Sequence, residues 1–306
     1  MRSVLYRLLF SVALLFLSAC SSSVQPHATW PAPGRYAVQW KAYLGAGVGE
    51  AVYPQFAFID VYAQQRPHSV PQIHELVLLT DRGPIRAIPQ GPVTPGPAHP
   101  NHQLFTLLTQ VSGLPAGTYT FHEIQYVDEF KQKRRLAVGV WVIEVLPEAA
   151  NALHEISHSV GATHFSILET EIQNPLPETI TLDGLHFALP GLPVTSTMVL
   201  EQAAPDHPHS SPASLSDFQL LPFLTIPGAL TLAPDEQARL AFLFGPDAVV
   251  QHERFVQLKP LLRYHIAAMP AFYSVAQQVY SRPFTDDTEI ISYLHALPTA
   301  AYHSLP

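Results

Sequence analysis

The chain has 306 residues, with 16 Lys and Arg against 24 Asp and Glu, and only one cysteine. The net charge of −8 argues against a nucleic-acid-binding protein, because neutralising phosphates requires a basic face. The 30 prolines are about twice the usual share, and proline interrupts helices, so the composition favours short strands joined by ordered loops.

The first twenty residues are typical of an export signal. Arg2 and Arg7 give a positive start, and the apolar segment 8–17 is about half as long as a membrane-spanning helix requires. Leu17-Ser18-Ala19-Cys20 then resembles the lipobox of bacterial lipoproteins. The resemblance implies that residues 1–19 are a lipoprotein signal peptide and that Cys20 becomes the acylated N-terminus of the mature protein.

Residues 20–33 carry Ser, Pro and Gln without apolar periodicity and are interpreted as a tether. Ser21 after the cysteine implies, by the same resemblance, the outer membrane of a Gram-negative bacterium. Loss of residues 1–19 removes two arginines and no acid, which leaves 14 basic against 24 acidic residues and a charge of −10. We therefore expect an exported protein held at the membrane through its N-terminal lipid.

Residues 34–147 are expected to form a first β-sandwich domain. Alternating apolar residues predict strands, whereas residues 104–111 fit either a strand or a short helix. Leu114-Pro115-Ala116-Gly117-Thr118-Tyr119 resembles the tyrosine corner of immunoglobulin-like sandwiches, in which the tyrosine hydroxyl bonds back to the upstream backbone. Lys131 to Arg135, the one basic run, is expected to be a solvated hairpin turn.

Residues 148–162 are interpreted as a linker or short helix, and residues 163–269 as a second β-sandwich domain with one long strand over 255–266. Residues 232–242 resemble a hairpin of immunoglobulin-like domains in bacterial envelope proteins, with Asp235 where glycine is usual. The expected fold class is all-β, with two tandem immunoglobulin-like β-sandwich domains and a short C-terminal helical tail.

That tail covers residues 270–306. Asp286 can cap a helix whose apolar stripe comprises Ile290, Ile291, Leu294 and Leu297. We expect this helix to pack against the second domain.

One motif carries clear chemistry. His154-Glu155-Ile156-Ser157-His158, followed by Gly161 and His164, reads H-E-x-x-H-x-x-G-x-x-H and resembles the zinc helix of metzincin peptidases. The resemblance implies that His154, His158 and His164 hold a catalytic zinc and that Glu155 is the general base.

The rest of the chain departs from the metzincin pattern. No long helix is expected between Arg35 and Ile59, and only Met198 and Met269 follow the motif where a methionine turn would lie. The same residues also alternate as a strand does. Both interpretations stay open: a zinc metallopeptidase, or a linker strand without a cofactor.

Two other histidine pairs are expected to lie in exposed loops, at Asp206-His207-Pro208-His209 and at His99-Pro100-Asn101-His102. They support a third interpretation, a periplasmic metal-binding protein. The primary expectation is a lipid-anchored envelope protein with a binding or assembly role, a protein partner in the envelope and no cofactor. The zinc peptidase is the alternative.

Overall fold

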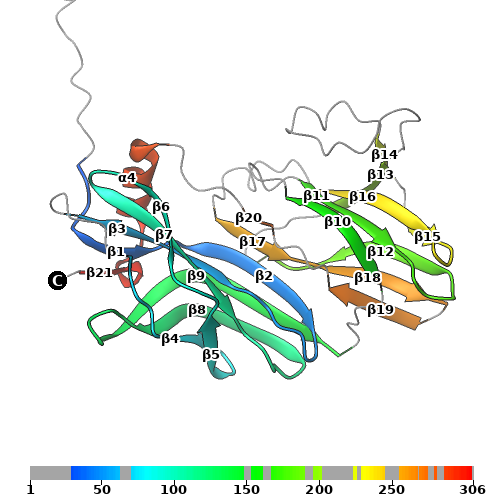
Figure 1. Ribbon diagram of the computed structural model, residues 1–306, viewed down its shortest axis with the longest axis horizontal. Coiled ribbons are helices and arrows are strands. Elements are labelled where there is room, and N and C mark those ends of the chain that lie inside the picture. Colours follow the sequence, from blue (N-terminus) through cyan, green and yellow to red (C-terminus); the bar gives the residue numbers. More distant parts are fainter. Residues whose placement is uncertain are drawn as a thin grey trace, which may run out of the picture.

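The structure is a computed structural model of the 306-residue chain, and it describes residues 29–62, 70–147, 153–160, 167–189, 196–201, 223–225, 229–244, 255–267, 269–274, 279–280 and 286–304. Within these residues the chain is mostly β-strand, with one α-helix near the C-terminal end (Figure 1). The expectation of a β protein is confirmed. None of the helical residues described forms a segment long and apolar enough to cross a membrane.

The first half of the chain builds one curled sheet. Its strands are β1 (Gly34–Ala37), β2 (Trp40–Gly47), β3 (Gln55–Val61), β4 (Glu75–Thr80), β5 (Gly83–Pro89), β6 (Thr94–Ala98), β7 (His102–Gln110), β8 (Gly117–Val127) and β9 (Lys133–Leu146). Residues 104–110 therefore belong to a strand, which settles the open choice between strand and helix there.

This sheet runs in the order β2-β9-β8-β4-β5-β7-β3-β1, with β6 paired to β7. β5 is joined to β7 by two residue pairs only, at Ile88 and Pro89. These pairs make the sheet continuous, whereas a sandwich would have two separate sheets. The sheet encloses one apolar core in which Phe56 and Phe121 both lie against the ring of Trp141. The first half is thus a curled sheet around a single core.

The tyrosine corner expected from the sequence is confirmed. The hydroxyl of Tyr119, at the start of β8, donates a hydrogen bond of 2.8 Å to the carbonyl of Pro115. The side chain is 6% exposed, so its polar tip would lose its solvation without this partner. The basic run is only partly in the expected turn. Lys131, with a left-handed φ of 60°, lies in the turn between β8 and β9, whereas Lys133 to Arg135 belong to β9.

The second half builds two smaller sheets, β10-β11-β16-β13-β14 and β15-β12-β18-β19. The strands of the second half are β10 (His154–Val160), β11 (Ile167–Gln173), β12 (Ile180–His186), β13 (Ser196–Glu201), β14 (Phe223–Thr225), β15 (Leu230–Leu232), β16 (Gln237–Phe244), β17 (Val256–Lys259), β18 (Leu261–Ile266), β19 (Met269–Ser274) and β20 (Val279–Tyr280). Side chains from both sheets, such as Leu240 and Tyr264, share one core.

The single strand expected over residues 255–266 is wrong. Pro260 separates β17 from β18, because proline has no N–H for a continuous ladder. β17 pairs parallel with β2 of the first half, whereas β18 pairs with β12 of the second. The two halves therefore meet along β2 and β17, where Tyr43 and Leu258 join the second core. A division into two domains stays a prediction.

The hairpin expected over residues 232–242 is also wrong. β15 pairs with β12 and β16 pairs with β11, so the connection between them passes from one sheet to the other. Asp235 takes a left-handed φ of 58° in this turn, which explains why glycine is usual there. The Glu236 carboxylate accepts a 2.7 Å hydrogen bond from the N–H of Ala233 and closes the turn.

The C-terminal segment comprises α4 (Asp287–Ala296), a short 3₁₀ turn η1 (Thr299–Ala301) and β21 (Tyr302–His303). Asp286 caps the helix as expected, accepting a 2.9 Å hydrogen bond from the N–H of Glu289. The expected packing partner is wrong, since Ile290 and Leu294 join the core of the first half. β21 pairs with β1, and this pairing fixes the whole segment beside the N-terminal strand (Figure 1).

Candidate functional site

The metzincin-like motif does not form a helix between His154 and Val160. These residues are strand β10, paired antiparallel with β11 and interrupted by a bulge between Glu155 and Ser157. A regular strand rises about 3.3 Å per residue, so four residues span about 13 Å, against about 6 Å in a helix. The bulge shortens this span, because His154 and His158 pair with Gln173 and Thr170, which are three residues apart on β11. The helical arrangement implied by the resemblance is therefore wrong here.

Several predicted residues lie outside the described ones. They are His164, the third histidine of the motif, Cys20 with the signal peptide, and the Asp206–His209 loop. The structure describes the backbone of β10 but not its side chains, so zinc binding by His154 and His158, with Glu155 as base, stays a prediction.

A different histidine pair is brought together with a carboxylate. His99 and His102 flank the turn between β6 and β7, and Asp287 is the first residue of α4. One ligand atom from each side chain lies within 4.8 Å of the other two. The Nδ1 of His99 is 3.8 Å from the nearer carboxylate oxygen of Asp287. Two imidazoles and a carboxylate are the ligand types of zinc and related transition metals.

His102 is the rigid member of this cluster. Its side chain is 2% exposed, and its ring is stacked between Trp30, at 4.9 Å between centroids, and His99, at 4.5 Å. Its Nδ1 atom is buried without a hydrogen-bond partner among the described residues. Burial, with the nearby His99, lowers the pKa of His102, and the ring is therefore neutral at pH 7.

The N-terminal residues 29–33 and the C-terminal segment hold each other beside this cluster. His295 Nε2 lies 2.9 Å from the carbonyl oxygen of Thr29, and the Tyr302 hydroxyl donates a 3.0 Å bond to the carbonyl of Pro33. Tyr302 also packs over Gly34, where a Cβ would collide with its ring. Sequence reasoning noticed His99 and His102 but missed Asp287, because nothing in the sequence indicates that α4 lies against the β6–β7 turn.

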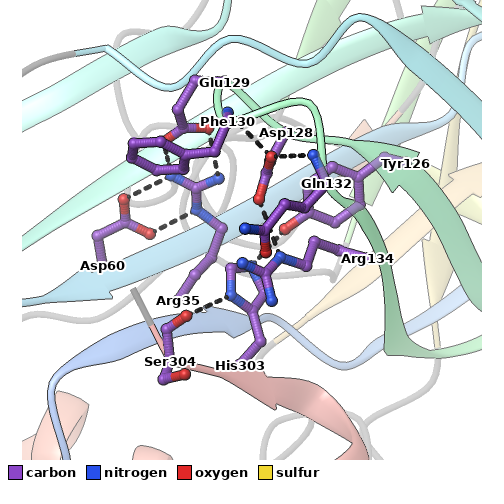
Figure 2. A network of polar contacts seen from close by, with 10 residues as sticks. All are labelled: Arg35, Asp60, Tyr126, Asp128, Glu129, Phe130, Gln132, Arg134, His303 and Ser304. Carbon is purple, nitrogen blue, oxygen red and sulfur yellow. Dashed lines mark hydrogen bonds and ion pairs between the residues drawn. The ribbon is translucent and has the colours of Figure 1, made fainter. Parts of the chain in front are cut away.

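A buried ion pair lies on β1, the strand that pairs with β21. Figure 2 shows its polar contacts. Arg35 of β1 is 1% exposed and donates two hydrogen bonds, of 2.8 and 2.9 Å, to the two carboxylate oxygens of Asp60 on β3. Glu129, in the β8–β9 hairpin, is the second and more distant partner at 3.4 Å. Burial alone would lower the pKa of Arg35, but the bonds and charge of Asp60 raise it instead, so the guanidinium stays charged.

The last strand attaches to this network through His303. The Tyr126 hydroxyl and His303 Nε2 are 2.6 Å apart, and His303 Nδ1 is 3.1 Å from the carbonyl oxygen of Ser304. A neutral ring protonated on Nδ1 satisfies both contacts. Desolvation lowers the pKa of His303, and the charges of Arg35 and Arg134 lower it further. The contact therefore suits the neutral ring.

Comparison with known proteins adds little to these observations. No family model matches the chain, and no curated protein matches it. Among solved structures, the fibronectin(III)-like modules of CbhA from Clostridium thermocellum are 7% identical, with a TM-score of 0.20 over 81% of this chain and 94% of that one. CBD12 from CALX1.2 is 9% identical, with a TM-score of 0.20 over 87% and 88%.

The secreted serine protease VesC from Vibrio cholerae is 10% identical, with a TM-score of 0.19 over 83% of this chain and 52% of that one. At such TM-scores these similarities carry no argument about function. The chain is a β-rich protein whose functional candidates rest on its own residues.

Proposed function

We propose that this protein is a lipid-anchored cell-envelope protein with a binding or assembly role. In this proposal acylated Cys20 holds it at the outer membrane of a Gram-negative bacterium. Its body consists of two tandem immunoglobulin-like units and engages a protein partner in the envelope, without a cofactor in that role. No step of this proposal requires catalysis.

The observation that carries the proposal is the attachment of residues 29–33 at one end of the body. His295 and Tyr302 bind the backbone of Thr29 and Pro33 there. Residues 21–28 separate Cys20 from Thr29, so the Cα atoms of Cys20 and Thr29 can be about 32 Å apart at most. An acylated Cys20 would hold the end that carries α4 and β21 near the membrane, with the sheets of the second half farther away (Figure 1).

Strand edges in the second half supply a means of binding. Among the described strands, β10 and β14 are the outer strands of one sheet, and β15 and β19 of the other. An outer strand presents unpaired backbone N–H and C=O groups, to which an extended segment of a partner can add as a further strand.

The anchor is tested by labelling cells with a radioactive fatty acid and separating their membranes. We expect the full-length protein to be labelled and to sediment with the outer membrane, whereas Cys20→Ser loses both the label and the sedimentation. Unlabelled wild-type protein in the soluble fraction would contradict the proposal.

The binding role is tested by placing a photo-crosslinking amino acid at successive positions of β10 and, as a control, at exposed Glu75 of β4. We expect one partner to be captured at alternate β10 positions and not at the control. Equal capture at both places, or none at β10, would contradict strand addition there. Proteolysis that is lost in Glu155→Gln would favour the zinc peptidase instead.

A further inference from the structure

We propose that His99, His102 and Asp287 form a binding site for one divalent transition-metal ion of the zinc class. The three side chains come from the β6–β7 turn and the first turn of α4, and their ligand atoms lie within 4.8 Å of one another. The site does not depend on the lipid anchor or on a protein partner.

His102 supplies the preorganised ligand. His102 is the first residue of β7, so the sheet fixes the position of its backbone. The ring of Trp30 stacks on its imidazole and holds that ring in place. The Nδ1 of His102 is a buried ring nitrogen without a partner among the described residues, which is unfavourable, and a metal ion bound at Nδ1 would supply that partner.

His99 and Asp287 supply the adjustable ligands. Their side chains are 46% and 52% exposed, so both can rotate without disturbing the core. Zinc bonds of about 2.0–2.1 Å bring ligand atoms to about 3.3 Å from one another. The lone pairs of an imidazole lie in the plane of its ring, so two stacked rings do not point at one ion. The exposed ring of His99 must therefore tilt away from the ring of His102 before both can bind the same ion.

An ordinary ion pair does not account for this cluster. His99 and Asp287 are 3.8 Å apart and largely exposed, and such a pair contributes little to stability. It also leaves Nδ1 of His102 without a hydrogen-bond partner among the residues that the structure describes. A metal ion with three protein ligands and water in the fourth position satisfies all three side chains.

The site would connect parts of the chain that are distant in sequence. An ion shared by the turn and Asp287 ties α4 to the first half, next to the residues that His295 and Tyr302 already hold. Since the ion binds only when these parts are together, its binding free energy stabilises the docked C-terminal segment.

The experiment measures zinc affinity of the full-length protein, purified in detergent with a tag free of histidine, by competition with a zinc indicator. We expect one zinc per chain in the wild type. His99→Ala and Asp287→Asn should each weaken binding at least ~10-fold, because even losses outside the first ligand shell cost that much. Both residues are exposed, so both variants should fold.

Matched controls separate metal binding from side effects. Exposed His122→Ala removes a histidine elsewhere, and Glu289→Gln removes the other acid from the first turn of α4. Both should keep wild-type affinity, as should the double variant His154→Ala/His158→Ala. Zinc should also slow hydrogen exchange of residues 286–304 in the wild type but not in His99→Ala.

Two results would overturn the proposal. One is a wild type that retains no zinc. The other is wild-type affinity in both His99→Ala and Asp287→Asn, including the case in which only the His154→Ala/His158→Ala variant loses the metal.

Discussion

Two segments of this chain carry a pair of histidines, and they differ in what surrounds them. His154 and His158 have the spacing of a zinc helix, yet their backbone is an outer strand of the second half. His99 and His102 have no such signature, yet they lie beside the contact between residues 29–33 and the C-terminal segment, where Asp287 joins them. The spacing in the sequence suggests a metal site at His154 and His158, whereas the neighbouring residues in the structure suggest one at His99 and His102.

A given spacing of histidines in the sequence brings them to one metal ion only if the chain there forms the right secondary structure. Four residues make about one turn of a helix but about 13 Å of strand. The turn at His99–His102, by contrast, keeps its two rings stacked, and the third ligand comes from a helix that no local pattern connects to it. Breaking the contacts that dock this helix therefore tests the difference between the two segments.

The largest effect is expected from Asp60→Ala. It removes the nearer of the two carboxylates that the described residues place beside the buried guanidinium of Arg35 and leaves Glu129 at 3.4 Å. Removing one partner of a buried ion pair costs about 3–5 kcal/mol. Urea unfolding should show this loss, and zinc affinity at the β6–β7 turn should fall because β1 no longer holds β21 and α4 in place.

The control for Asp60→Ala is Arg263→Ala in the second half. Arg263 is 51% exposed in its contact with Asp183, and exposed pairs contribute about 0–1 kcal/mol. Equal losses for the two variants would show that the charges near the chain ends have no special structural role.

A somewhat smaller effect is expected from Leu294→Ala. Leu294 is the most buried apolar residue of α4 at 3% exposure, and such truncations cost about 2–5 kcal/mol. Hydrogen exchange should accelerate in residues 286–304 while β10 and β11 stay protected. Ser292→Ala, on the exposed face of the same helix, is the control. Acceleration confined to the second half would contradict the observed packing of the helix.

The smallest effect is a pH dependence from His303. Its pKa is lower in the folded protein than the ordinary value of 6.5, so the unfolded chain binds more protons below that pH. The contribution of neutral His303 to the free energy of unfolding is present above pH 6.5, and it is lost as the pH falls through the pKa of His303 in the folded protein. Tyr126, Arg35 and Arg134 surround the ring, with Asp128 as the opposing charge.

The measurement is urea unfolding of the wild type and of His303→Asn between pH 7.5 and 5. The wild type should lose more stability on acidification than the variant, which has no proton to gain at this position. Parallel pH profiles would show that His303 does not contribute.

Some local features could be predicted from the sequence, whereas the long-range pairings could not. Proline content and alternation indicated a β protein, and the bond from Tyr119 to Pro115 follows from a motif confined to a few residues. Asp286 likewise capped the helix where it was expected. Both hydrogen bonds join residues three or four positions apart, so the residues that make them can be recognised from a short stretch of sequence.

The features that depend on distant partners were missed. The pairing of β17 with β2, and of β21 with β1, is decided by which sheet edge each strand can reach in the folded chain. The same reason hid Asp287 from the candidate metal site. A hydrophobic stripe shows that α4 packs on a core, but it does not show which core.

Zinc-loaded crystals of the full-length protein, with anomalous diffraction measured across the zinc absorption edge, test the central claim most directly. We predict one anomalous peak within about 2.2 Å of ligand atoms from His99, His102 and Asp287. A peak at His154 and His158, with none at the β6–β7 turn, would contradict it.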